Sequence, residues 1–237
     1  MAPRFSRYAV YYTPPPGPLA DFGAGWLGWD LLRGRAAAAP PDLSASDFSA
    51  PHLAACTEAP RRYGFHATIK PPFSLAPGCS EADLCGALRR LGADLSPIRT
   101  APLRLDRLGR FLALTLSEPN ETITDLAARI VTELDDFRAP MSAAEQARRQ
   151  TPHLSPRQQQ NLRDWGYPHV LADFRFHMTL TGRLDRQALA RVQEILSDRL
   201  VRLLNSPFAL DSLSIVGERA DSMFVEIDRI ALTGRAP

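Results

Sequence analysis

The sequence predicts an α+β fold built from two similar halves, each with an antiparallel sheet and packed helices. Alternating apolar and polar residues predict strands, and apolar residues three or four apart predict helices. The order of these segments repeats, because a strand carrying His-x-Thr, a helix and a strand pair occur twice. The motif histidines, His66 and His177, lie 111 residues apart, and the matching strand starts, Phe111 and Met223, lie 112 apart. We therefore expect an internal duplication.

The elements of the first half follow from local signals. The sequence predicts, in order, a strand over 7–13, a short helix around 25–32, a motif strand within RYGFHATIKPPF (62–73), a helix over 80–92 and two paired strands over 100–118. The segment PPPGP ends the first strand, Ser80 is the N-cap of the second helix, and Gly109 marks the turn of the strand pair. Residues 35–60 are rich in alanine, proline and serine without periodicity, so we expect an irregular surface excursion there.

A connecting segment and the second half complete the chain. The sequence predicts, in order, an amphipathic helix over 120–137, short helices within 138–150 and 154–166, a motif strand over 173–182, a long helix over 184–206 and two strands over 208–232. Gly166 and Pro168 end the second short helix. We expect one domain over 1–237, with a first lobe over about 1–119, connecting helices over about 120–170 and a second lobe over about 171–237.

The composition is that of an ordinary globular chain. The 237 residues are 45% hydrophobic and 23% charged, and the length allows a substantial core. A net charge of +2 gives no global basic field for nucleic acid, so any anion preference must come from local placement of cations. The sequence has an odd number of cysteines, without C-x-x-C spacing: Cys56, Cys79 and Cys85. This pattern is not typical of a disulfide framework or a zinc site, and it fits a reducing cytosol. With no signal peptide and no membrane-spanning run, we expect a cytoplasmic monomer without a membrane partner.

Each motif strand has one apolar and one polar face, because side chains on a strand alternate. In the first strand the polar face carries His66, Thr68 and Lys70, opposite Phe65, Ala67 and Ile69. In the second strand the polar face carries Arg175, His177, Thr179, Thr181 and Arg183, opposite Phe174, Phe176, Met178 and Leu180. The apolar faces are expected in the core.

A hydroxyl, an imidazole and a cation in one row suit a phosphate group. The cation and the hydroxyl donate to phosphate oxygens, and an imidazole moves a proton near neutral pH. Two imidazoles flanking one phosphorus can take a proton on one side and deliver one on the other, each transfer contributing roughly 10²–10⁴ in rate. The alternative is a polar row on a half-buried sheet, which alternation alone produces for a single His-x-Thr. Two copies in matching places, using two of the five histidines, favour a site.

The segments FHATI and FHMTL resemble the paired motifs of the two-histidine (2H) phosphoesterase superfamily, which includes RNA 2′,3′-cyclic phosphodiesterases and 2′-5′ RNA ligase-like proteins. The longer blocks RYGFHATIKPPF, RAPMSAAEQARR and WGYPHVLADFRFHMTLTG resemble a branch of phosphonate metabolism proteins from bacterial phosphonate operons. This resemblance covers nearly the whole chain. It implies two pseudo-symmetric lobes around a central cleft and metal-independent chemistry on a phosphodiester. His66 and His177 would transfer protons, while Thr68 and Thr179 would hold phosphoryl oxygens.

Five further residues are candidates for substrate binding. Lys70 shares the His66 face, although the prolines that follow also allow a solvated strand end. Arg175 and Arg183 share the His177 face, and a salt bridge is an alternative for Arg183. Tyr63 and Tyr167 precede the motif strands and can stack on a base or sugar, but aromatic residues also pack simply in cores. For Tyr167 the alternative is packing on Trp165.

Other motifs carry weaker signals. One block contains Arg138, Glu145, Arg148 and Arg149. The spacing of Glu145 to Arg148 and Arg149 predicts a helix-surface ion pair, which we favour, and the alternative is that the block forms a basic lid over the cleft. The segment GAGWLG (23–28) fits G-x-G-x-x-G, but no strand runs directly into it, so we expect no nucleotide cofactor. No metal is expected either, because each motif supplies one imidazole without a neighbouring ligand cluster. The remaining histidines, His52, His153 and His169, are expected in surface loops.

These observations lead to three hypotheses about function. The first is a metal-free phosphodiesterase that opens a cyclic phosphodiester of a small sugar or nucleotide. The second is a binding protein for a phosphorylated metabolite or RNA end without turnover. The third is an RNA ligase or RNA-end processing enzyme, against which the modest net charge weighs slightly. The expected partner is a small phosphorylated or cyclic-phosphate substrate.

Overall fold

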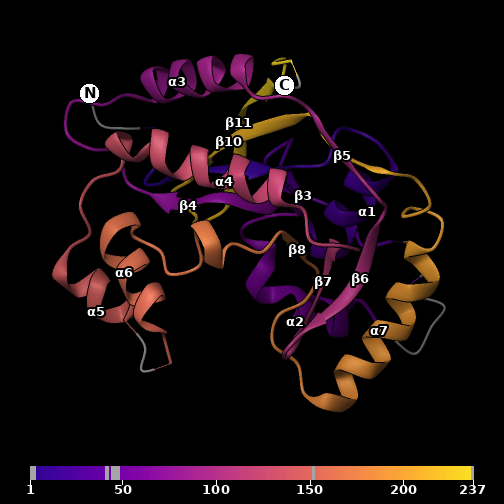
Figure 1. Cartoon of the computed structure of the whole chain (residues 1–237). Coiled ribbons are helices and arrows are strands. Elements are labelled where there is room, and N and C mark those ends of the chain that lie inside the picture. The colour runs from indigo at the N-terminus through magenta and orange to yellow at the C-terminus, as the bar shows by residue number, and fades with distance from the viewer. Residues whose placement is uncertain (1–3, 41–42, 44–48, 151–152, 236–237) are drawn as a thin grey trace.

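A seven-stranded antiparallel sheet forms the centre of the computed structural model (Figure 1). The structure describes residues 4–40, 43, 49–150 and 153–235, apart from the side chain of Arg148. The strands of the sheet are, in spatial order, β11 (Phe224–Ala231), β10 (Ser212–Glu218), β1 (Tyr8–Tyr12), β4 (Ala67–Phe73), β8 (His177–Thr179), β7 (Phe111–Leu116) and β6 (Leu103–Leu108). Two short ribbons pair β2 (Trp29–Asp30) with β3 (Arg35–Ala36), and β5 (Ile98–Thr100) with β9 (Phe208–Leu210).

Seven α-helices among the described residues surround this sheet. They are α1 (Pro18–Leu27), α2 (Ala50–Arg61), α3 (Glu81–Asp94), α4 (Glu121–Glu133), α5 (Ala143–Arg149), α6 (Pro156–Trp165) and α7 (Arg186–Leu200). Short 3-10 turns cover Asp135–Phe137 and Leu171–Asp173. Figure 1 shows α5 and α6 together at one end of the molecule and α7 at the other. None of the helices in the described ranges is both long enough and apolar enough to cross a bilayer.

The α+β fold class predicted from the sequence is confirmed. The order strand, helix, strand pair occurs as β4, α3, β6 and β7, and again as β8, α7, β10 and β11. The two halves interleave in the sheet, because β7 from the first half pairs with β8, while β10 from the second half pairs with β1. The sheet is therefore continuous through its middle, where β4 and β8 are neighbours. The division into lobes at the expected boundaries stays a prediction.

The apolar faces of both motif strands lie in the core, as their alternation predicts. Ala67 and Ile69 are each 1% exposed, and Met178 and Leu180 are fully buried. Local signals also end the elements where expected. Ser80 forms a capping box with Asp83 at the start of α3, and Gly166 ends α6 in the left-handed conformation. The motif residues thus emerge from a sheet whose opposite face is packed.

Residues 50–61 contradict the expected irregular excursion, because they form helix α2. Its buried side chains, Leu53, Cys56, Thr57 and Pro60, follow helical spacing, and Pro51 stands in the first turn, where its missing amide costs nothing. The alanines and prolines hide this pattern in the sequence. Residues 41–42 and 44–48 lie outside the described residues. The second motif strand also differs, since β8 covers only His177–Thr179 of the expected 173–182.

Candidate active site

The two His-x-Thr motifs lie side by side at the centre of the sheet. β4 and β8 run antiparallel, and their register pairs Ala67 with Met178. Continuing this register by one residue sets each histidine of one motif opposite the threonine of the other. His66 and His177 are then diagonal neighbours on one face, a relation that brings Cβ atoms to about 7 Å. The two imidazoles therefore start from neighbouring positions on one face of the sheet.

The backbone orients both motif imidazoles in the same way. Nδ1 of His66 lies 2.9 Å from the carbonyl oxygen of Gly64, and Nδ1 of His177 lies 2.8 Å from that of Arg175. A carbonyl oxygen only accepts hydrogen bonds, so each Nδ1 carries the proton and donates. Nε2 of the neutral ring is left as an acceptor, and in the first motif it accepts from the Thr68 hydroxyl at 3.0 Å. Each ring thus presents Nε2 for proton transfer.

His66 is the more enclosed of the two histidines. Its ring stacks on Tyr11 of β1, with centroids 3.7 Å apart and planes at 20°. Burial lowers the pKa of His66 from 6.5 to about 4; its hydrogen bond to Gly64 opposes this shift, and the charge of His177 adds to it. His66 is therefore neutral at neutral pH, and its Nε2 is the acceptor nitrogen, which the Thr68 hydroxyl contacts. The ring beside His177 is Phe111, whose centroid lies 6.0 Å away.

An open cleft of about 880 Å³ adjoins the motifs. This volume lies within the range of ligand sites in proteins, roughly 300–1,000 Å³. His66, Thr68 and Thr179 line the cleft. Among the described residues the lining includes Phe111 but not His177, so the second imidazole lies at the margin. The cleft therefore brings three of the four predicted catalytic residues into its wall and leaves the fourth beside it.

Lys70 does not lie on the cleft face, and this expectation is corrected. The pairing of β1 with β4 shifts register between Thr68 and Lys70, and such a bulge turns the side chains that follow it. Lys70 is 2% exposed. Its Nζ donates to the Val131 carbonyl at 2.8 Å and forms an ion pair with Asp135 at 3.0 Å. Burial lowers the pKa of Lys70, and the carboxylate of Asp135 opposes that shift. Lys70 thus ties β4 to α4.

The other predicted substrate-binding residues divide into two groups. Tyr63, Tyr167 and Arg183 line the cleft. Arg183 is exposed, and within the described ranges no carboxylate pairs with it, so the alternative of a salt bridge is not seen. Arg175 is also exposed but does not contribute its side chain to the wall; its carbonyl orients His177 instead.

The block around α5 contains the ion pair that we favoured. Arg149 pairs with Glu145 at 2.7 Å in i,i+4 spacing, and both residues line the cleft. Arg138 pairs with Asp135 at 2.8 Å and lies outside the cleft wall. The side chain of Arg148 lies outside the described residues. The charges of Arg149 and Glu145 therefore balance each other at this edge of the cleft.

Three residues that line the cleft were not predicted from the sequence. Tyr11, Arg7 and Arg62 all line the cleft beside His66. Tyr11 reaches this position because β1 pairs with β4 and sets Tyr11 opposite Thr68. Strand alternation puts Tyr11 on the same face of β1 as Ala9. The residues that this face contacts depend on how the strands pair, which the local sequence does not indicate. For Arg62, the available signal was its position next to Tyr63 in the motif segment.

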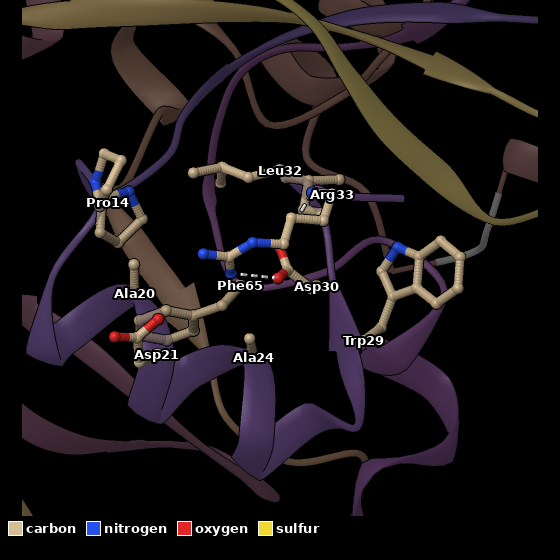
Figure 2. A pocket seen from close by; sticks show the side chains of 11 residues that line it. Pro14, Ala20, Asp21, Ala24, Trp29, Asp30, Leu32, Arg33 and Phe65 are labelled. Carbon is tan, nitrogen blue, oxygen red and sulfur yellow. Dashed lines mark hydrogen bonds and ion pairs between the residues drawn. The ribbon is translucent and has the colours of Figure 1, made fainter. Parts of the chain in front are cut away.

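A second, much smaller cavity lies beside α1 (Figure 2). Its volume is about 30 Å³, and an ion pair of 2.7 Å between Arg33 and Asp30 lies at its edge. This space suits about two water molecules. The glycines of GAGWLG lie within α1 and at its C-cap, Gly28, rather than between a strand and the start of a helix. The segment therefore does not form a dinucleotide-binding loop.

The three remaining histidines are all exposed. His52 lies in α2 rather than in a loop, with Nδ1 2.8 Å from the Ser49 hydroxyl. His169 packs against the ring of Tyr167 at 5.8 Å between centroids. In the part of the chain that the structure describes, no three His, Cys, Asp or Glu side chains gather as metal ligands would.

The antiparallel fold and the paired motifs are in keeping with the class of two-histidine phosphoesterases. The chain belongs to the family described as "Protein of unknown function (DUF1045)", whose model matches residues 68–225. The matched region includes Thr68, His177 and Thr179, and begins just after His66.

Two curated relatives share the name "Ribose 1,5-bisphosphate phosphokinase PhnN". The protein of Janthinobacterium sp. (strain Marseille) is 36% identical over 97% of this chain and 51% of its own length. That of Laribacter hongkongensis (strain HLHK9) is 38% identical over 76% of this chain and 40% of its own length. The chain thus spans about half the length of the curated relatives it matches or less. Among solved structures, E. coli LigT complexed with 3′-AMP aligns over 97% of this chain and 99% of its own, with 12% identity and a TM-score of 0.46.

Proposed function

We propose that this chain is a phosphodiesterase that hydrolyses a cyclic phosphodiester of a small sugar or nucleotide. His66 and His177 are its proton-transfer pair. The observation that carries the proposal is the diagonal relation of two imidazoles whose Nδ1 atoms are each bound to a backbone carbonyl, which leaves Nε2 as the acceptor nitrogen of each neutral ring. Thr179 donates to the phosphoryl oxygens, and Thr68 does so once its hydroxyl turns from His66 to the substrate, which also frees Nε2 of His66. One such donor contributes about 3 kcal/mol to a transition state when well placed. No metal takes part in this mechanism.

The low pKa of His66 favours it as the base. A water molecule attacks phosphorus and gives its proton to Nε2 of His66, which is neutral above about pH 4. The new P–O bond forms as the ring P–O bond breaks. His177 begins protonated and delivers the proton of Nε2 to the departing sugar oxygen. The product is a phosphate monoester beside a free hydroxyl, and exchange with solvent restores both rings.

The name of the curated relatives supports a sugar phosphate as the substrate class, but the kinase activity is not proposed for this chain. Lys70 is the only lysine of the sequence, and it is buried against Val131 and Asp135. The phosphate-binding pattern G-x-x-x-x-G-K-[ST] is absent from the sequence. A part in phosphonate metabolism is proposed from the resemblance of the longer sequence blocks.

A substrate panel in excess chelator tests the proposal. Nucleoside 2′,3′-cyclic phosphates, ribose cyclic phosphates and short RNA ends are incubated with the protein in EDTA, and released monoester is measured. We expect turnover of at least one small cyclic phosphate. His66→Ala and His177→Ala should each lower kcat/KM by about 10²–10⁴, the usual worth of a proton-transfer group.

His153→Ala is the matched control, because His153 is exposed and lies outside the cleft wall. It should keep wild-type turnover. Near-wild-type activity in either motif variant would overturn the mechanism. Tight binding without hydrolysis over hours would favour the binding protein, and turnover of RNA ends alone would favour an RNA-processing enzyme.

A further inference from the structure

The cleft wall beside His66 carries two arginines in different electrostatic states. Arg7 donates two hydrogen bonds to Glu218, at 2.6 and 2.7 Å, and this carboxylate is 7% exposed. The charge of Arg7 is therefore matched within the protein. Arg62 lies on the same wall, and no carboxylate of the described ranges lies within ion-pair distance of its guanidinium.

Arg62 is held firmly although it forms no ion pair within the described residues; its charge acts at longer range on Glu218, the carboxylate that Arg7 binds. Its carbonyl accepts a hydrogen bond from the Phe224 amide at 2.8 Å, which fixes the backbone to β11. Its guanidinium carbon lies 4.5 Å from the centre of the Tyr63 ring, and Nη2 donates to the Tyr63 hydroxyl. Nε is buried and has no hydrogen-bond partner. A buried donor without a partner costs free energy, so this Nε–H is suited to an acceptor that a ligand brings.

Tyr11 has a second unpartnered group on the same wall. The residue is fully buried and lines the cleft, and its hydroxyl makes no hydrogen bond. The hydroxyl of Tyr11 and Nε of Arg62 are the only two buried side-chain polar atoms without a partner in the part of the chain that the structure describes. Native proteins leave few such atoms. Finding both in one wall of one cleft points to a ligand group there.

The charge balance of the cleft identifies the kind of group. Arg149 is matched by Glu145 at 2.7 Å, and Arg7 by Glu218. Arg62 and Arg183 form no ion pair among the described residues, and the carboxylate on which Arg62 acts at longer range, Glu218, is already bound by Arg7. A cyclic phosphodiester carries a single negative charge, and under the proposed function it lies against the motif imidazoles and threonines. A guanidinium beside that site suits a second anion, and arginine favours phosphate because its donors match two phosphate oxygens.

We propose that Arg62 and Tyr11 form a second phosphate subsite, so that the substrate is a cyclic phosphodiester of a sugar that also carries a phosphate monoester. This inference rests on the proposed function. The monoester accepts hydrogen bonds from Nε of Arg62 and from the Tyr11 hydroxyl, while the cyclic phosphate lies between the motif histidines. Discrimination is strong in such a site, because a substrate without the monoester leaves both buried donors unpaired.

A matched pair of probes tests the subsite by binding. Adenosine 2′,3′-cyclic phosphate with and without a 5′-phosphate is titrated calorimetrically against His66→Ala protein, which removes turnover under the proposed mechanism. We expect the 5′-phosphate to raise affinity by about tenfold or more, as one charge-assisted contact supplies. Arg62→Met and Tyr11→Phe, each added to His66→Ala, should reduce that gain to about twofold or less.

Arg129→Met is the control, because Arg129 is an exposed arginine of α4 that pairs with Glu133 outside the cleft. It should keep the full gain. A gain below about twofold in the parent protein, including no binding of the bisphosphorylated probe, overturns the subsite. So does a gain that survives Arg62→Met or disappears only in Arg183→Met. If the gain follows Arg62 while His66→Ala still hydrolyses the probes, the subsite stands and the proposed mechanism fails.

Discussion

At the scale of single residues, Tyr11 breaks the symmetry of the two motifs. β1 sets Tyr11 opposite Thr68, whereas β7 sets Ala113 opposite Thr179. The first histidine therefore has an aromatic ring stacked on it, and the equivalent position beside the second motif carries only a methyl group. Under the proposed function, this difference assigns the two imidazoles different proton-transfer roles, which the sequence motifs alone leave interchangeable.

The first residue-scale prediction concerns pH. Because the pKa of His66 is about 4, its basic form persists in acid, and the acid limb of kcat/KM should lie near pH 4. Tyr11→Ala admits water to the ring and should move that limb toward 6.5, the ordinary pKa of histidine. Tyr11→Phe keeps the stacked ring and should leave the limb in place. A wild-type limb near 6.5, or no difference between the two variants, contradicts this assignment.

The same shift couples folding to pH. The depressed pKa of His66 means that the unfolded chain binds this proton more readily than the folded chain. The contribution of neutral His66 to the free energy of unfolding is thus fully present above pH 6.5, and it is lost as the pH falls toward 4. Urea midpoints of the wild type and His66→Ala should converge across that interval.

At the scale of elements, the turn between α2 and β4 positions His66. Gly64 has φ of 72°, and a Cβ on it would lie 2.7 Å from Cβ of Leu31. Its carbonyl also accepts the hydrogen bond from His66 Nδ1. Gly109, in the turn between β6 and β7, has φ of 62°, but a Cβ added there would meet no atom within 4 Å. The two glycines share a left-handed backbone conformation, which glycine adopts without strain, and differ in the atoms that surround them.

This contrast gives an element-scale prediction. Gly109→Ala should lower the free energy of unfolding by about 1–2 kcal/mol, the cost of a left-handed alanine, and leave kcat unchanged. Gly64→Ala should lose more stability and also lower kcat by about tenfold, since a shift of its carbonyl turns the imidazole. Chemical denaturation and steady-state kinetics measure both effects. Equal kinetics in the two variants would show that the turn does not orient His66.

Two elements show why sequence patterns have limits at this scale. The buried positions of α2 are present in the sequence at helical spacing, but two of the four are Thr57 and Pro60, which are not counted as apolar helix formers. In β4 the alternation predicts the faces correctly as far as Ile69. The bulge after Thr68 then changes the face, and it depends on pairing with β1 rather than on local composition. The sequence predicts the wrong face for Lys70 for that reason alone.

At the scale of the whole molecule, the first half of the chain makes hydrogen bonds that hold the motif strand of the second half. Nε1 of Trp26 in α1 donates to the Leu180 carbonyl at 2.8 Å. The Gly182 amide donates to the Cys56 carbonyl of α2 at 2.7 Å. Both bonds lie just beyond β8, the strand that carries His177 and Thr179.

Removing one of these ties gives a whole-molecule prediction. Trp26→Phe leaves the buried Leu180 carbonyl without this donor and should cost about 1–3 kcal/mol in unfolding free energy. It should also lower kcat several-fold, because β8 is less well placed. Ile230→Val in β11 serves as control, with a stability loss of about 0.5–1.5 kcal/mol and unchanged kcat. If kcat of Trp26→Phe also stays at the wild-type level, this tie does not position β8.

The repeat of elements around the two motifs allowed the fold class and the motif residues to be predicted from sequence. His66, Thr68, His177 and Thr179 occur in one pattern, twice, with the same elements behind them. Arg62 and Tyr11 have no counterpart in the second half, so the repeat cannot reveal them. Their place in the cleft comes from contacts between distant segments, which no local pattern encodes.

The middle of the sheet has a consequence for how this chain can be divided. β4 and β8 share a single register pair, so few backbone bonds cross the line between the two imidazoles. The ties that hold β8 come from α1 and α2, while the strand beside β1 comes from the second half. Neither half is therefore a unit of function. A cut within the connecting helices should therefore yield two fragments that each lack part of the site, and the proposed activity should return only when both fragments are mixed.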